Sequence, residues 1–205
     1  MSFDVDKLFE HAIEKINEFA NQHQNETFYA FAIDASLICF NSVEQADNTL
    51  AEYQNNWERT HRVIDSWDDM TDQDHKDVEW LLGFHQRSRG LDINDKEACL
   101  QVINQERILA RERDNGNPYK QPDNVTDLRH NTGDWAYQGF ATMEEENGFD
   151  HEAYNQHYDM SDEDQLKSEY GLAMDQLVTK LKESGIFKKL KCTDDFYAIR
   201  VEHNY

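Results

Sequence analysis

The chain of 205 residues is short of cysteine, proline, glycine and basic side chains, and each shortage excludes a class of protein. Three scattered cysteines without a C-x-x-C pair favour buried thiols in a reducing compartment over a disulfide framework. Two prolines and eight glycines are too few for a low-complexity linker. No apolar run approaches the roughly 20 residues of a membrane span, and the first residues lack a secretory leader. We therefore expect a cytoplasmic protein without membrane association.

Basic residues are outnumbered two to one, with 20 Lys and Arg against 42 Asp and Glu, for a net charge of -22. Sequence-independent binding to nucleic acid requires Lys and Arg against phosphate, so we expect no direct nucleic-acid binding. This charge and a mean hydropathy of -0.93 are typical of disordered chains. The 11 Phe, nine Tyr and four Trp supply enough apolar area for a core, so the chain is predicted to fold.

Apolar residues at three- and four-residue spacing predict amphipathic helices over residues 5–21 and 162–182. Aromatic-rich runs bounded by turn residues predict strands near 27–40, 128–142 and 196–202. We expect an α+β fold with a largely antiparallel sheet. The N-terminal and C-terminal amphipathic helices should cover one face of that sheet.

The middle of the chain is predicted to be helical throughout. Thr71 caps a helix that stops before Gly90, and Asn94 or Asp95 caps another that ends in the basic residues before Asp114. We interpret residues 57–120 as a helical insertion within a single domain that spans 1–205.

The charge is concentrated in one part of the chain, because residues 121–179 hold 2 basic and 14 acidic residues. A strongly acidic surface speeds the capture of a basic partner by electrostatic steering. A solvated surface with no partner explains the same composition. The candidate partner-binding residues are the carboxylates of the two densest runs: Glu144, Glu145, Glu146, Asp162, Glu163 and Asp164.

A stretch around residues 131–140 is the most distinctive motif, and its residues Gly133, Asp134, Trp135 and Tyr137 have two readings. They form either a recognition loop with exposed aromatic rings or a hairpin whose rings pack against the two amphipathic helices. We favour the packed hairpin and expect Trp135 and Phe31 to be buried.

Patterns for catalysis, cofactors or metals are missing. His151 and His157 are six residues apart, whereas a helical zinc pair needs spacing i and i+4, so surface histidines are the better interpretation. The acidic run over 159–164 lacks the glycine and the final Glu of an EF-hand. Glycine-rich phosphate loops and G-x-S-x-G elbows are absent. We assign no catalytic residue, cofactor or metal, and we expect purified protein to carry no stoichiometric transition metal.

Three short segments resemble an uncharacterised bacterial family, domain of unknown function 4303. They are residues 28–32 (FYAFA), 133–137 (GDWAY) and 193–198 (TDDFYA). With their flanking helices they cover about two-thirds of the chain, and the helical middle is where this chain is enlarged. The resemblance implies an α+β domain, sometimes encoded near toxin-immunity genes, and it brings no catalytic residues.

Together these observations favour a non-enzymatic acidic binding protein, of the immunity type that inhibits a basic protein toxin. Two alternatives stay open: an enzyme whose site is assembled only in the fold, and an acidic mimic of DNA that blocks a DNA-binding protein.

Overall fold

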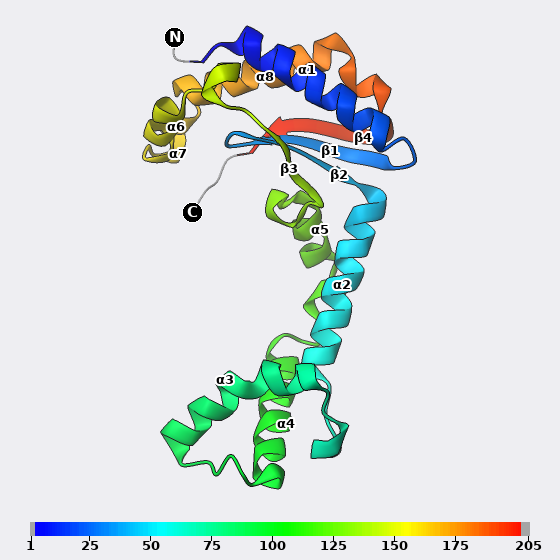
Figure 1. Ribbon diagram of the computed structural model, residues 1–205, viewed down its shortest axis with the longest axis vertical. Coiled ribbons are helices and arrows are strands. Elements are labelled where there is room, and N and C mark those ends of the chain that lie inside the picture. Colours follow the sequence, from blue (N-terminus) through cyan, green and yellow to red (C-terminus); the bar gives the residue numbers. More distant parts are fainter. Residues whose placement is uncertain (1–2, 202–205) are drawn as a thin grey trace. The chain divides into compact units, whose positions relative to one another are not determined.

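Four strands form one mixed sheet in the order β3-β2-β1-β4 (Figure 1). The pairs β1–β2 and β2–β3 are antiparallel, whereas β1 and β4 are parallel. The computed structural model describes residues 3–201, and for Asp162 it describes only the backbone. The strands are β1 (Thr27–Asp34), β2 (Leu37–Ser42), β3 (Tyr137–Thr142) and β4 (Lys191–Arg200). The predicted α+β class is confirmed, and two of the three strand pairings are antiparallel.

The chain divides into two units, of which the first joins the residues up to Thr49 with those from Leu128 on, and the second is Leu50–Asp127. The first unit holds the sheet and most of the acidic charge, with 25 acidic and 10 basic residues against 17 and 10 in the second. Its helices and 3-10 turns are α1 (Val5–Gln22), η3 (Thr132–Asp134), η4 (Glu145–Asn147), α6 (His151–Tyr158), α7 (Asp162–Gln165), α8 (Glu169–Ser184) and η5 (Ile186–Lys189).

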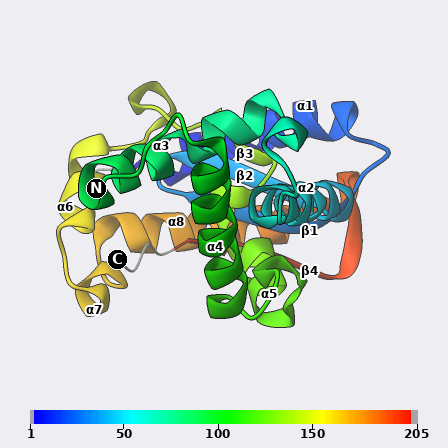
Figure 2. The ribbon, with the colours of Figure 1, turned by 90° about the horizontal axis from the view of Figure 1, so that it is seen from below.

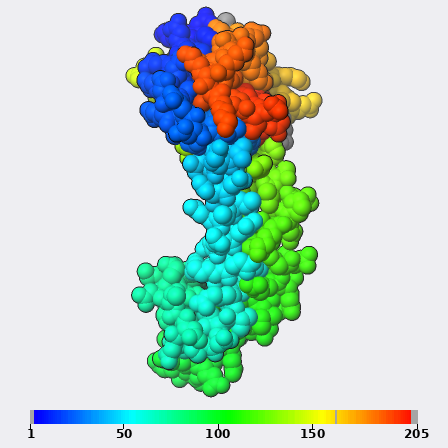
Figure 3. All heavy atoms as spheres, turned by 90° about the vertical axis from the view of Figure 1, so that its right-hand side faces the viewer, coloured from blue at the N-terminus to red at the C-terminus, as the bar shows by residue number. Residues whose placement is uncertain are grey.

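Helices α1 and α8 lie side by side on one face of the sheet, as predicted (Figures 1 and 3). Their apolar stripes meet the same strand face in a core where most residues are nearly or fully inaccessible to solvent. Representative members are Leu8 and Ile16 of α1, Leu177 of α8, and Phe31 and Phe40 of the strands. Burial of such side chains contributes roughly 1.5–3 kcal/mol each, so this layer is the main source of stability for the first unit.

The opposite face of the sheet carries a second, smaller core. Ala30, Ala32 and Cys39 point to this side because side chains alternate along β1 and β2, and Ala46 and Trp135 pack on them. Tyr29 lies on this face as well, because the pairing of β1 is irregular between Phe28 and Ala30. Trp135 is 4% exposed, so its predicted burial is confirmed. Its predicted packing against the amphipathic helices is wrong, because the sheet lies between Trp135 and those helices.

The second unit is helical. It contains the greater part of α2 (Val43–His61), then η1 (Trp67–Asp69), α3 (Asp72–Arg89), α4 (Lys96–Arg113), η2 (Pro118–Lys120) and the first residues of α5 (Pro122–His130). Helices α3 and α4 cross and pack on each other (Figure 2). The predicted caps are confirmed, since Thr71 forms a capping box with Asp74, and Asp95 accepts from the Ala98 amide.

Three predicted boundaries are wrong. Residues 128–130 belong to a helix and not to a strand, because Pro122 occupies the first helical position and starts α5 there. The helix expected over 162–182 is broken after Gln165, since the Ser168 hydroxyl accepts from the Gly171 amide and caps a new helix. Strand β4 begins at Lys191, five residues earlier than expected.

Candidate binding surfaces

The acidic run Glu144, Glu145 and Glu146 lies in the turn that follows β3, and all three side chains are exposed. Gly148 ends this turn with φ +92°, and its carbonyl accepts from the Asp4 amide at 2.9 Å. The run is therefore fastened beside the first turn of α1. Glu144 contacts His151, with 3.3 Å between a carboxylate oxygen and Nε2.

The second acidic run forms α7, directly before α8. Glu163 and Asp164 are exposed, and Asp164 accepts from the Ser161 hydroxyl at 2.8 Å. The side chain of Asp162 lies outside the described part of the chain. Ser161 precedes the helix, and its hydroxyl bonds a carboxylate and caps no amide in the described residues.

Both runs belong to the same end of the first unit. The ring of Phe3, before α1, contacts the rings of Phe149 and Tyr170, with centroids 5.4 and 5.9 Å apart. Phe149 follows the first run and Tyr170 opens α8, so the beginnings of both long helices meet here. Helix N-termini carry partial positive charge, which stabilises nearby carboxylates. The helix N-termini therefore favour the clustering of carboxylates at this acidic end, and the clustered carboxylates can attract cations.

The Gly133–Tyr137 motif is divided between two faces of the sheet. Asp134 accepts from the side-chain Nδ2 of Asn131 at 2.6 Å, and Gly133 donates its N–H to Oδ1 of the same side chain, which closes η3. The Trp135 indole N–H donates to the carbonyl of Arg129 at 2.9 Å. These bonds make the stretch before Trp135 a fixed turn with a buried ring at its end. Exposed recognition aromatics are not found in it.

Tyr137 and Phe140 share the face covered by α1 although they are three positions apart. A regular strand would place them on opposite faces, but β3 has two more residues than β2 over this stretch and Gly139 has φ +62°. The bulge lets both rings contact Phe19, at centroid distances of 5.0 and 4.5 Å. For these two rings the predicted packing on an amphipathic helix is confirmed.

A polar cluster that the sequence did not reveal surrounds Glu26. Its carboxylate accepts from the hydroxyls of Ser42 and Tyr137, both at 2.6 Å, and lies 2.9 Å from His23 Nδ1. Burial opposes ionisation of this group, yet these hydrogen bonds hold its pKa below the usual range. Burial and the contact with Glu26 raise the pKa of Tyr137 to about 12. Ser42 is fully buried and donates to a carboxylate, so the cluster fastens strands and offers no exposed nucleophile.

His151 and His157, the two histidines weighed as metal ligands, both lie on α6 but in different environments. His151 is half-exposed, as a surface histidine should be, whereas His157 is buried and lies 2.7 Å from the Ser168 hydroxyl. The surface interpretation of His157 is wrong, because α6 packs against α8 and turns this ring onto Tyr170. Among the described residues, no group of three or more His, Cys, Asp or Glu is arranged to hold a metal ion.

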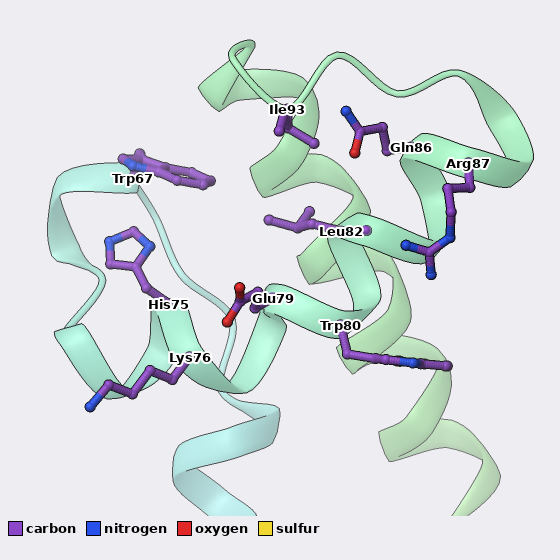
Figure 4. A pocket seen from close by; sticks show the side chains of 10 residues that line it. Trp67, His75, Lys76, Glu79, Trp80, Leu82, Gln86, Arg87 and Ile93 are labelled. Carbon is purple, nitrogen blue, oxygen red and sulfur yellow. The ribbon is translucent and has the colours of Figure 1, made fainter.

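Sequence reasoning also missed an open groove along α3 in the second unit (Figure 4). It has a volume of about 720 Å³, and Trp67, Leu82, Gly83 and Ile93 are among its lining residues. Trp80 of α3 also lines the groove and is 73% exposed. The weak periodicity of α3 hides this surface, because charged and apolar residues alternate around the whole helix.

Comparison of the chain with protein-family models, with curated proteins and with solved structures finds no match. The resemblance to domain of unknown function 4303 therefore stays a prediction. Of the helices in residues 3–201, none has both the length and the apolar character that a bilayer crossing requires.

Proposed function

We propose that the protein is a non-enzymatic acidic binding protein that captures a basic protein, and that this partner is a toxin it neutralises. The observation that carries the proposal is the acidic end of the first unit. Five described carboxylates, Glu144, Glu145, Glu146, Glu163 and Asp164, are exposed there beside the beginnings of α1 and α8.

The charge balance of the first unit favours a basic partner over other classes. Its 25 acidic and 10 basic residues produce a field that attracts cations over roughly the 8–10 Å screening length of physiological salt. Such a field raises association rates and rejects acidic competitors, and it adds less to the final affinity. Inhibitors of basic toxins need this kinetic behaviour, because the toxin must be bound before it reaches its target.

The experiment compares two variants with the same loss of charge. The first changes Glu144, Glu145 and Glu146 to Gln. The second changes three exposed glutamates of the second unit to Gln: Glu52, Glu97 and Glu112. Both variants remove three negative charges, so a difference between them reports local docking and not overall charge.

Tagged parent protein is first used to isolate a partner from host cells, and association rates with that purified partner are then measured. We expect the first variant to associate roughly three- to tenfold more slowly than the second at low salt, with the difference shrinking as salt rises. The partner should be basic, and should arrest growth when expressed alone and not with the parent protein. Equal rates for the two variants contradict the docking site. A partner that is harmless when expressed alone contradicts the immunity role.

A further inference from the structure

The groove along α3 carries charges of both signs on one helix face. Its lining includes Lys76, Glu79 and Arg87, so its formal charge is +1 with His75 neutral, on a chain whose net charge is -22. A basic partner would meet two cations here. This face is therefore unsuited to the partner proposed for the acidic end.

Glu79 and Arg87 find no ion-pair partner within the described residues. They are eight residues apart on α3, about 12 Å along the helix axis, so they cannot pair within one chain. Gly83 lies midway between them. Figure 4 shows the Arg87 side chain extending back along the helix, and an added Cβ on Gly83 would meet only its Nη1, at 3.3 Å.

Gly83 has no local reason to be glycine. It sits inside a helix without positive φ, where glycine is less stable than alanine. Its one close neighbour is the end of a flexible side chain, which an alanine could displace. A residue without a side chain at the centre of an open face permits the close approach of another backbone.

We propose that this face binds the same face of a second copy of the chain, with the two α3 helices antiparallel and Gly83 at the two-fold axis. In that arrangement residues four positions before and after Gly83 meet, so Glu79 of each copy lies opposite Arg87 of the other. Trp80 and Gln86 lie three positions before and after Gly83, so Trp80 of each copy covers Gln86 of the other. A two-fold contact must be self-complementary, and the symmetric placement of opposite charges about Gly83 meets this requirement.

The exposed rings of α3 supply the apolar part of the contact. Trp80 is 73% and Phe84 43% exposed, and the two rings stack at a centroid distance of 5.8 Å. Large exposed aromatic side chains flanked by charges are typical of interface centres. A single helix pair buries less area than standard interfaces, so the dimer is a weak, concentration-dependent one.

The test is sedimentation velocity on the full chain at physiological salt over roughly 1–500 µM, the range in which weak dimers form. We expect the mass to rise from 24.2 kDa towards twice that value. Glu79→Arg or Arg87→Glu alone places like charges opposite each other at both symmetry-related contacts. Either change should weaken association at least tenfold. The double variant restores both pairs and should return to within about threefold of the parent. Glu112→Arg, an exposed reversal elsewhere in the second unit, should have no comparable effect.

Gly83→Leu separates binding from folding. Leucine favours the helix, so the melting temperature should not fall, whereas its side chain blocks the contact and should abolish dimer formation. A parent chain that stays monomeric at the highest concentration overturns the proposal. A double variant as weak as the single ones also overturns it, because Glu79 and Arg87 would then face different groups. The proposal of a basic partner at the acidic end does not depend on either result.

Discussion

Asp74 is the most enclosed charge in the second unit, and its removal provides a quantitative test of how that unit is held together. Its side chain is inaccessible to solvent and accepts from the Thr71 amide at 3.0 Å and the Thr71 hydroxyl at 2.7 Å. Arg62 donates to it at 2.8 Å, and Arg107, itself 5% exposed, lies 3.5 Å away. Asp74→Asn keeps the shape and removes the charge that these donors share.

The expected loss of unfolding free energy follows from the arginine charge that stays buried after Asp74→Asn. Removing one partner of a buried ion pair costs about 3–5 kcal/mol, because the other charge is left without compensation. That value applies to Arg107, whereas the Arg62 side chain is 38% exposed and retains contact with water. We therefore expect Asp74→Asn to lower the free energy of unfolding by about 2–4 kcal/mol.

Asp77→Asn is the matched control. Asp77 lies one turn further along α3 and pairs with Arg59 on the surface, where the side chains are 24% and 36% exposed. Its loss should cost less than about 1 kcal/mol. Urea unfolding followed by tryptophan fluorescence reports on this unit, because three of the four tryptophans lie within residues 50–127.

The pH dependence supplies a second test. Burial opposes the charge of Asp74, but the Thr71 and Arg62 hydrogen bonds outweigh it and hold the pKa well below the usual range. A pKa that is lower in the folded state stabilises the fold above the unfolded value near 3.9, and this stabilisation is lost as pH falls through the folded pKa. The difference between parent and Asp74→Asn should be constant from about pH 8 to 5 and shrink below about pH 4. A loss equal to that of Asp77→Asn, or a difference that shrinks already between pH 8 and 6, would refute the reasoning.

Two further substitutions test the first unit. Trp135→Ala should lower the free energy of unfolding by about 3–5 kcal/mol, and Trp135→Phe by less, because phenylalanine fills most of the site and loses mainly the bond to the Arg129 carbonyl. A Trp135→Ala variant that melts like the parent and loses its partner would make this ring a recognition residue. Gly148→Ala should cost about 2–3 kcal/mol, since its φ is positive and its Cβ would lie 2.7 Å from that of Asp4. Gly90→Ala, with a similar φ and open space around it, should cost about 1 kcal/mol. Equal losses of stability for Gly148→Ala and Gly90→Ala in thermal unfolding would contradict the steric argument.

Helices with strong local signals could be predicted from the sequence almost to the residue. The apolar stripe of α1 and the Thr71 and Asp95 caps depend on residues within one or two turns of each other. Such interactions form whatever the rest of the chain does. Strands β1 and β2 were equally clear because a short turn joins them and fixes their pairing.

The tertiary structure alone decided which residues meet across long stretches of chain. Nothing local shows that β4 pairs with β1 in parallel, or that a bulge at Gly139 turns Tyr137 and Phe140 to one face while Trp135 packs on the other. The groove on α3 was hidden for the same reason. Composition sets the charge and the aromatic content of the chain, but the exposure of Trp80 depends on which side of α3 packs on α4. Side-chain identity is local information, whereas burial depends on the packing of distant segments.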